Sequence, residues 1–366
     1  MLNNKIIAVV VPAYNEEKQI GRVIETMPDF VDRIVIVNDC SKDNTAEIVI
    51  KYINSDFNNT NIEVTKIIQE KNFYNNAEII KAKIEEDELK LFEPSEIYNK
   101  KTNKDRIILI NNLINSGVGA SVAIGYKWCR DYNIDCIAKI DGDGQMDPAE
   151  LESICKPVVE EYVDYVKGNR LIHRSAWLVI PKIRYVGNSF LSILTKIASG
   201  YWKISDTQTA YTAISLKAIK AIRLHKLYKS YGYPNDILVK LNIAMCTIKE
   251  IPIKPVYNIG EKSKIKLFKV IPKISLLLFN SFFKRLWYKY FFRDFHPLFI
   301  LYHSSFILFL LCVPVAYRII SFLSIPERTS SPVLNSILFM LLFISAFQSL
   351  LFAMWMDIQD NERLYK

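Results

Sequence analysis

The chain has 366 residues, which is enough for a large hydrophobic core in one or two domains and excludes disorder throughout. Lys and Arg number 47 against 38 Asp and Glu, a formal net charge of +9, and the excess is concentrated between residues 261 and 294. Apolar residues such as Phe279, Phe283 and Trp287 interrupt these cations. This mixture favours an anionic membrane surface as partner and argues against nucleic acid.

The six cysteines form no Cys-x-x-Cys pair, and the four histidines lie at spacings that suit no helical metal pair. A zinc ribbon and a disulfide framework are therefore not indicated. The first apolar run is too short for the hydrophobic region of a signal peptide. We expect the chain to start in the cytosol.

The first part of the chain alternates short β-rich runs with helical stretches, which is the pattern of a parallel sheet covered by helices. Strands are expected over 6–11, 34–37, 62–68, 107–110 and 136–140, and helices over 17–26, 45–52 and 119–130. Residues from about Glu70 to Arg106 are rich in Lys, Glu and Asn and are interpreted as an insertion. Its centre, 77–91, is expected to form a solvated, charged helix without a chemical role.

Two stretches near the end, 297–317 and 329–356, contain no charged residue, and each is long enough to cross a hydrocarbon layer of about 30 Å. A single run of this kind is explained equally well as a buried core helix. Two in succession predict a membrane hairpin. Because the basic segment precedes the first span, the positive-inside rule places the preceding domain and both termini in the cytoplasm and the loop around Glu327 outside.

Ligands of open α/β sheets bind beyond the carboxyl ends of the strands, so the residues that follow each strand are candidates for a site. The first strand runs into PAYNEE at 12–17, and the second ends in NDCSKDNT at 38–45. Taken alone, either motif is explained by an ordinary turn or a helix N-cap.

The third motif, DGDGQMDP at 141–148, is harder to explain as a turn. Asp141, Asp143 and Gln145 bring two carboxylates and an amide together, and the intervening glycines let the backbone curve around one hard cation such as Mg²⁺ or Mn²⁺. A Ca²⁺ loop is the alternative, but its twelve-residue spacing and terminal Glu are missing. A cation with so few protein ligands normally completes its shell with water and phosphates, which implies a diphosphate partner.

The motifs PAYNEE, NDCSKDNT, NSGVGA, DGDGQ, GNR and DTQTAYTAIS follow one another in an order that resembles glycosyltransferase family 2. The resemblance is to its dolichol-phosphate mannosyltransferase and polyprenyl-phosphate glycosyltransferase branch, and it covers almost the whole chain outside the insertion. It implies a GT-A fold, a Rossmann-like domain for nucleotide-diphospho-sugars. Asn38, Cys40 and Met146 stand where the family more often has Asp, Gly and His, and none of them is an expected metal ligand.

The resemblance implies roles for the matching residues on the donor side. The nucleotide sugar would be bound by Pro12, Ala13, Tyr14, Glu16, Asp39 and Asp141. The metal would be held by Asp141, Asp143 and Gln145, and Asp143 is also expected to be catalytic.

On the acceptor side, Arg170 of GNR matches an arginine that contacts the lipid phosphate and is expected, like Asp143, to be catalytic; a guanidinium fork suits phosphate oxygens. A surface salt bridge is the alternative. Residues 181–198 resemble the family's interfacial amphipathic helix, in which Arg184 is a second phosphate candidate. Lys264 matches a segment that closes over phosphates, although simple attraction to anionic lipid explains it nearly as well.

The resulting prediction is an inverting glycosyltransferase that moves a sugar from GDP-mannose or a UDP-hexose to dolichyl or undecaprenyl phosphate, with Mg²⁺ or Mn²⁺. A phosphate monoester has a second pKa of about 6, so it needs no protein base. Transfer to a hydroxyl of a lipid-linked saccharide or polysaccharide stays open, with Asp206 or Asp236 as base. A non-catalytic membrane scaffold of the same fold, and a homo-oligomeric state, also stay open.

The expected architecture is a GT-A domain, then amphipathic juxtamembrane helices, then a two-helix transmembrane hairpin. The boundaries are expected at 1–260 for the catalytic domain, 261–295 for the basic juxtamembrane region, about 297–320 and 331–356 for the spans, and 357–366 for a cytoplasmic tail.

Overall fold

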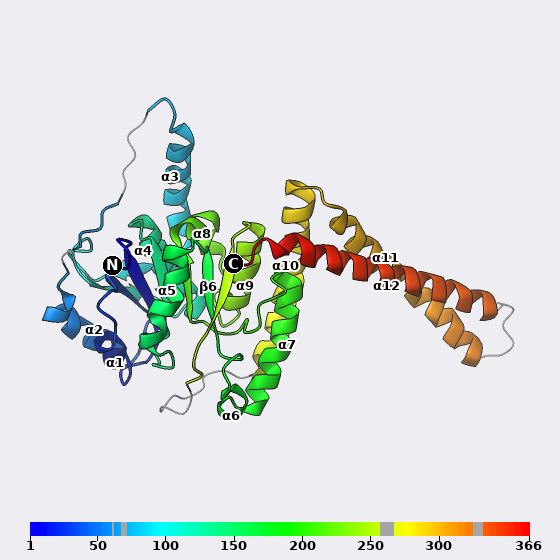
Figure 1. The fold of residues 1–366 in the computed structure, drawn as a ribbon, viewed down its shortest axis with the longest axis horizontal. Coiled ribbons are helices and arrows are strands. Elements are labelled where there is room, and N and C mark those ends of the chain that lie inside the picture. Colours follow the sequence, from blue (N-terminus) through cyan, green and yellow to red (C-terminus); the bar gives the residue numbers. More distant parts are fainter. Residues whose placement is uncertain (61, 67–71, 257–266, 325–331) are drawn as a thin grey trace.

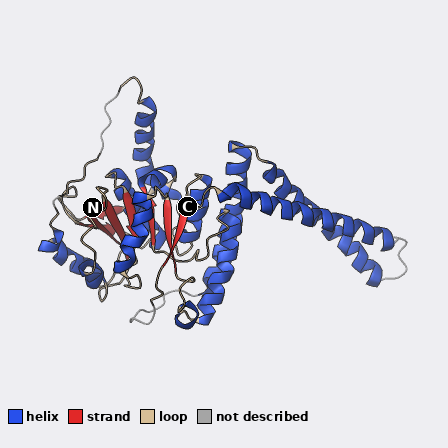
Figure 2. Ribbon diagram, viewed as in Figure 1, coloured by secondary structure: helices blue, strands red, loops and turns tan. Residues whose placement is uncertain are grey.

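A computed structural model describes residues 1–60, 62–66, 72–256, 267–324 and 332–366. Its centre is an eight-stranded sheet in the order β3-β4-β2-β1-β5-β7-β6-β8 (Figure 2). The strands are β1 Ile7–Ala13, β2 Arg33–Asn38, β3 Ser95–Ile97, β4 Ile107–Asn112, β5 Cys136–Lys139, β6 Tyr165–Asn169, β7 Thr212–Ser215 and β8 Ile248–Pro252.

Most of the sheet is parallel. Strands β1, β2, β4 and β5 run in one direction, and β6 and β8 share that direction because β7 pairs antiparallel with both β5 and β6. The carboxyl ends of these six strands therefore lie at one edge of the sheet. Only β3 and β7 run the other way among the described strands.

Helices cover both faces of the sheet (Figure 2). Alternate residues along β1 point to opposite faces, as a strand requires: Ile7 and Val9 join one core cluster, and Ala8 and Val10 join the other. The helices of the sheet domain are α1 Ile20–Glu25, α2 Thr45–Ile53, α3 Asn76–Glu88, α4 Val118–Asp131, α5 Leu151–Glu160, α6 Ala176–Val179, α7 Lys182–Ser199, α8 Leu216–Ala221 and α9 Tyr233–Ile243. Single 3₁₀ turns lie at Asp56–Asn58, Leu89–Leu91, Pro148–Glu150 and Leu224–Lys226.

The expected strands and helices are present with small shifts at their ends, except for the strand expected over 62–68. That prediction is wrong for the described part, because 62–66 form no strand. The edge position beside β4 is taken instead by β3, from within the expected insertion, which pairs antiparallel with β4. The guanidinium of Arg33 donates to the carbonyl oxygens of Ile62 and Asn103. The segment around Ile62 is therefore held by side-chain hydrogen bonds and not by backbone pairing with a strand.

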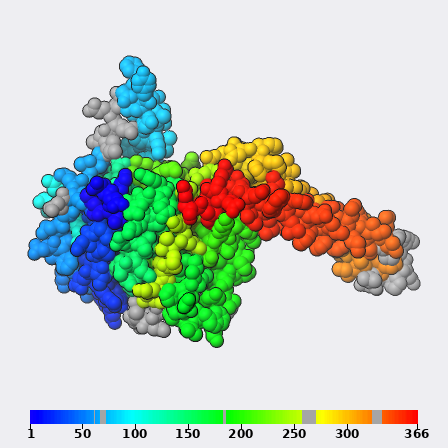
Figure 3. Space-filling view, viewed as in Figure 1, coloured from blue at the N-terminus to red at the C-terminus, as the bar shows by residue number. Residues whose placement is uncertain are grey.

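Helix α3 of the insertion projects from the domain as an arm (Figures 1 and 3). Helix α3 has no buried residue, as expected for a solvated helix. The arm is attached at its carboxyl end, where the Glu85 carboxylate lies 3.8 Å from Arg130 and that of Glu88 lies 3.3 Å from His225.

After the sheet domain come α10 Leu267–Trp287, a short π-helix at Tyr288–Arg293 (η5), α11 Pro297–Ser324 and α12 Pro332–Glu362. Helices α7 and α10 lie side by side, and a third apolar cluster joins them to α9 and to the base of the α11–α12 hairpin. Most of the hairpin stands away from the rest of the molecule (Figure 3).

Both hairpin helices are long and apolar enough to cross a membrane, with mean hydropathies of 2.2 and 2.3. Only 33% of the most apolar stretch of α11 and 11% of that of α12 is buried, whereas the core helix of a soluble protein is mostly buried. Apolar side chains that are exposed on this scale need a non-aqueous neighbour. The two predicted apolar helices are thereby confirmed as candidates for membrane association.

Candidate active site

The register of the sheet brings the donor and acceptor motifs together. Lys139 of β5 and Lys167 of β6 both pair with Thr212 of β7, so the two lysines flank that residue across three neighbouring strands. Because β5 and β6 are parallel, Asp141 and Arg170 then leave the sheet at the same edge. The motifs that follow β1, β2 and β4 meet them there.

The first two motifs form one unit. The backbone N–H of Asn15 donates to the Ser41 hydroxyl at 3.0 Å, and that of Glu16 donates to the Thr45 hydroxyl at 2.9 Å. Cys40 has a φ of 58°, a conformation that glycine adopts without strain, and this accounts for the family's preference for Gly at that position. The loop with Pro12, Ala13, Tyr14 and Glu16 is thus held against the loop after β2.

Asp39 is buried and faces the start of α4. Its Oδ1 accepts from Asn112 Nδ2 at 2.8 Å and from the Ser116 N–H at 2.9 Å, and its Oδ2 accepts from the Gly117 N–H at 2.8 Å. An ionised carboxylate offers about four acceptor positions. Asp39 therefore fixes the NSGVGA loop, and a nucleotide would have to use what remains of its accepting capacity.

The DGDGQ loop packs directly on the end of β1. A Cβ on Gly142 would lie 3.2 Å from the Pro12 carbonyl oxygen and 3.4 Å from Ala13 Cβ, so a larger residue there would be tightly packed against β1. Asp143 Oδ1 accepts the Gln145 N–H at 3.0 Å, which closes the turn. The carboxylate of Asp141 pairs with the buried ammonium of Lys139.

The acidic residues of this loop are close enough to disturb one another. Burial, followed by the negative charge of Asp141 and more weakly that of Glu16, raises the pKa of Asp143 to about 6. A divalent cation would relieve this repulsion. In the part of the chain that the structure describes, no three His, Cys, Asp or Glu side chains are arranged to hold a metal by themselves. Asp141, Asp143 and Gln145 remain the candidate ligands of a cation whose shell a bound diphosphate would complete.

Arg170 is held by a buried carboxylate. Its Nε lies 2.8 Å from Asp206 Oδ2 and its Nη2 lies 3.1 Å from Oδ1, while the Asp206 side chain is 1% exposed. Burial alone would raise the pKa of Asp206, but the charge and hydrogen bonds of Arg170 together with the charge of Lys167 outweigh it and lower that pKa. Asp206 is anchored in turn by Glu250 of β8, which accepts its N–H at 3.0 Å.

Two buried lysines, Lys139 and Lys167, belong to the site but were not predicted from the sequence. Lys167 donates to the Thr209 carbonyl, and burial lowers its pKa to about 7 although Asp206 opposes this shift. Its charge interacts with Arg170 and with Lys139, which itself interacts with Asp143, so the two halves of the site are electrostatically linked. A lysine inside an otherwise apolar strand, as in CIAKI and YVKGN, is the signal that could have found them.

Of the other acceptor candidates, the structure describes neither the side chain of Arg184 nor any part of Lys264. Arg184 lies in the first turn of α7, and Lys264 lies outside the described residues. Asp236 accepts the Tyr228 N–H at 2.8 Å and pairs with Lys240. Around α7 an apolar surface is exposed, made of Trp177, Leu178, Val186, Phe190 and Ile193 with Leu276 and Phe279 of α10.

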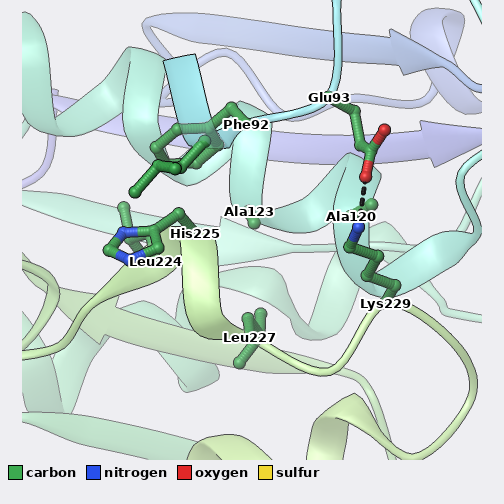
Figure 4. Close-up of a pocket in the computed structure, with 9 residues that line it drawn as sticks. Phe92, Glu93, Ala120, Ala123, Leu224, His225, Leu227 and Lys229 are labelled. Atoms are coloured by element: carbon green, nitrogen blue, oxygen red, sulfur yellow. Dashed lines mark hydrogen bonds and ion pairs between the residues drawn. The ribbon is translucent and has the colours of Figure 1, made fainter. Parts of the chain in front are cut away.

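A narrow pocket lies elsewhere, where the base of the arm meets α4 (Figure 4). Phe92 and His225 face each other across it with ring centroids 6.2 Å apart, and an ion pair between Glu93 and Lys229 closes one side. None of the predicted site residues lines it.

The sequence profile described as Glycosyl transferase family 2 matches residues 8–77 and 93–223, more than half of the chain. The chain belongs to glycosyl transferase family 2. The match is interrupted over the arm, where the insertion was expected, and it spans the strand-end motifs from PAYNEE to DTQTAYTAIS. Family membership and the mixed sheet confirm the predicted GT-A-like α/β fold and the prediction of a glycosyltransferase.

Curated relatives cover most of this glycosyltransferase. A UDP-N-acetylglucosamine--dolichyl-phosphate N-acetylglucosaminyltransferase of Methanococcus voltae is 28% identical over 70% of this chain and 87% of its own length. A dolichyl-phosphate beta-glucosyltransferase of Trichomonas vaginalis is 23% identical over 76% of this chain and 74% of its own. An uncharacterised protein of Methanocaldococcus jannaschii is 25% identical over 75% and 93%.

Among solved structures, similarity extends to glucosyl-3-phosphoglycerate synthase from Mycobacterium tuberculosis in complex with Mn²⁺, uridine diphosphate and glucosyl-3-phosphoglycerate. The TM-score is 0.46 at 13% identity, over 77% of this chain and 80% of that one.

Proposed function

We propose that this glycosyltransferase transfers a sugar from a nucleotide sugar to the phosphate of a polyprenyl phosphate at the membrane surface. The observation that carries the proposal is the shared sheet edge, which places the acidic pair Asp141 and Asp143 at the same end of the strands as Arg170. From Arg170 the chain continues into α6 and α7, which expose apolar side chains. The names of the Methanococcus and Trichomonas relatives, which both contain dolichyl phosphate, support the same acceptor. Those names also make UDP-N-acetylglucosamine and UDP-glucose the first donors to test, ahead of GDP-mannose.

The proposed reaction requires no covalent bond between the sugar and the protein. An oxygen of the acceptor phosphate bonds to the anomeric carbon as the bond from that carbon to the donor diphosphate breaks, with inversion. The products are a lipid phosphosugar and a nucleoside diphosphate. Mg²⁺ or Mn²⁺, held by Asp141, Asp143 and Gln145, would neutralise charge on the leaving diphosphate. Arg170, held in a fixed orientation by Asp206, orients the incoming phosphate.

Transfer to a hydroxyl is less well supported, because it needs a carboxylate that accepts a proton. Asp206 is saturated by Arg170 and by the backbone N–H groups of Gln208 and Thr209, and its lowered pKa makes it a weak base. Asp236 is paired with Lys240. Neither carboxylate is presented to an acceptor hydroxyl.

The catalytic domain and both termini are proposed to lie in the cytoplasm, as the basic segment before the first span predicts. The basic segment, residues 261–294, contains nine Lys or Arg residues, and the structure describes the side chains of five of them. Of these five, Lys273, Lys284 and Arg293 are exposed. Arg285 and Lys289 are buried and face the protein. The exposed cations are the ones suited to anionic lipid.

The direct test uses the purified full-length protein in lipid–detergent micelles. It is incubated with labelled UDP-N-acetylglucosamine, UDP-glucose or GDP-mannose, with dolichyl or undecaprenyl phosphate, and with or without EDTA. We expect label in the lipid fraction with one donor, equimolar release of nucleoside diphosphate, and loss of both with EDTA. A lack of labelled lipid with every donor and both lipids would reject the proposal.

A further inference from the structure

The C-terminal residues, 357–366, pack against the sheet domain. Helix α12 continues beyond its apolar part, and its last turns carry Asp357 and Asn361, whose side chains are both 0% exposed. There they meet Arg285 of α10 and Lys289 of the π-helix, which are equally buried. The segment predicted as a cytoplasmic tail is thus packed against the domain.

Arg285 joins α12 to the end of α7. Its Nη1 and Nη2 lie 2.7 and 2.8 Å from the two carboxylate oxygens of Asp357, a bidentate pair. Its Nε donates to the Ala198 carbonyl at 2.9 Å, and Nη2 also donates to the Ile197 carbonyl at 3.1 Å. These carbonyls belong to the last turn of α7, which has no further helical donors for them. Gly200 permits the approach, because a Cβ there would lie 2.5 Å from Nη1.

Lys289 joins α12 to α9 of the sheet domain. Its Nζ lies 3.0 Å from the carboxylate of Asp360, and it donates to the side-chain oxygens of Asn361 at 2.6 Å and Asn242 at 3.2 Å. The amide of Asn242 in turn donates to Asn361 at 2.7 Å. Two buried cations thus face two carboxylates, and the amides complete their hydrogen bonds, as buried charges require.

The last residues reach the sheet itself. The Ile248 N–H donates to the Leu364 carbonyl at 2.7 Å, and the Lys366 N–H donates back to the Ile248 carbonyl at 3.2 Å. Strand β8 is the outermost strand of the sheet on this side, so the tail pairs with its open edge. Leu364 is 4% exposed and enters the core cluster that lines the sheet, beside Tyr365.

We propose that Arg285, Lys289, Asp357, Asp360 and Asn361, here called the C-terminal lock, position α7 relative to the α11–α12 hairpin and thereby set the depth at which a lipid phosphate meets Arg170. The proposal rests on the proposed lipid-phosphate acceptor. Helix α7 exposes its apolar residues along its length, and its C-terminal end is tied to the hairpin through Arg285. Asp357 is a positioning residue, since it acts through Arg285.

A positioning role can be separated from a stabilising one. Removing one partner of a buried ion pair leaves a stranded charge and destabilises the fold, whereas replacing both partners with apolar residues of similar size is often neutral for stability. We therefore compare Asp357→Asn with the double variant Arg285→Met/Asp357→Leu. Gln359→Ala, an exposed residue in the same turn of α12, is the matched control.

The experiment uses the full-length protein in mixed micelles. It measures the KM for polyprenyl phosphate, the Kd for the nucleotide sugar by calorimetry, the melting temperature, and hydrogen exchange of the amides of residues 197–203. In both lock variants we expect the acceptor KM to rise about 10- to 100-fold, as a displacement of about 1 Å at a reacting group can cause, with an unchanged donor Kd. The 197–203 amides should lose protection, and the control should match the wild type.

The proposal is overturned if the double variant melts like the wild type and keeps its acceptor KM, since the lock would then be purely structural. It is also overturned if protection at 197–203 is unchanged in a folded lock variant. If the wild type transfers no sugar to polyprenyl phosphate, the proposed function fails, and hydrogen exchange still decides whether the lock holds α7.

Discussion

Asp141 and Asp143 follow the end of β5, where burial and then the charge of Asp141 raise the pKa of Asp143; a cation would offset this repulsion. We predict that Asp143→Asn lowers the rate of transfer by about 100-fold or more, because a lost electrostatic contact at the transition state typically has that effect. The protein should stay folded, since Asp143 lies on a loop and outside the core clusters. Initial rates and a melting curve check this prediction. If the variant keeps the wild-type rate, the DGDGQ motif is an ordinary turn without a catalytic role.

The raised pKa of Asp143 predicts a pH dependence of metal binding. Its pKa is about 6 in the fold and about 3.9 in an unfolded chain, so without metal the ionisation of Asp143 removes stability as the pH rises from about 4 to 6. Mn²⁺ competes with the proton for this carboxylate. The increase in melting temperature on adding Mn²⁺ should therefore be small at pH 5 and large at pH 7.5. Asp143→Asn should show no such difference between the two pH values; an equal increase in that variant would place the metal elsewhere.

Arg170 is predicted to act on the acceptor. Arg170→Lys keeps a charge beside Asp206 but loses the bidentate geometry, so the KM for polyprenyl phosphate should rise roughly tenfold while donor affinity stays unchanged. Arg170→Ala should have a larger effect and also lower the melting temperature, because Asp206 is left buried without its partner. Rates against acceptor concentration and calorimetry with the donor separate the two substrates. Loss of donor affinity with a normal acceptor KM would assign Arg170 to the diphosphate.

At the level of elements, two helical glycines predict opposite effects. Gly125 of α4 packs on β1, and a Cβ there would lie 2.4 Å from Val10 Cγ1, so Gly125→Ala should destabilise the protein by about 1–3 kcal/mol through overpacking. Gly187 of α7 has its nearest neighbour at 3.8 Å, so Gly187→Ala should stabilise it by about 0.5–1 kcal/mol. Denaturant unfolding measures both. Equal effects would mean that α4 does not pack on β1 as closely as the contacts indicate.

For the whole molecule, the distribution of charge predicts the orientation of the hairpin. A cysteine introduced at the exposed Lys100 should be labelled by an impermeant maleimide only after intact cells are opened, whereas one introduced at Glu327 should be labelled from outside. Cys40→Ser in the background removes the one partly accessible native thiol among the six. The reverse labelling pattern would invert the topology, and labelling of both sites from outside would contradict the hairpin.

The sequence by itself determined much of the fold and the outline of the site, because those signals are local or periodic. Short apolar runs that alternate with helical stretches specified most strands. Motifs at the strand ends marked Asp141 and Asp143, and long uncharged stretches marked the hairpin. The edge strand was misplaced, because 62–68 has strand-like composition whereas 95–97, Ser-Glu-Ile, does not, and only the pairing with β4 reveals β3.

Tertiary structure alone decided which polar residues are buried together. Asp39 turns toward the start of α4, Arg170 is paired with Asp206, and Lys139 and Lys167 flank Thr212 only because β5, β7 and β6 lie in that order. Arg285 and Asp357 are separated by 71 intervening residues, and neither position in the sequence indicates a partner. The free energy of burying a charge depends on what surrounds it in space, and that arrangement is fixed by packing across elements that are distant in the sequence.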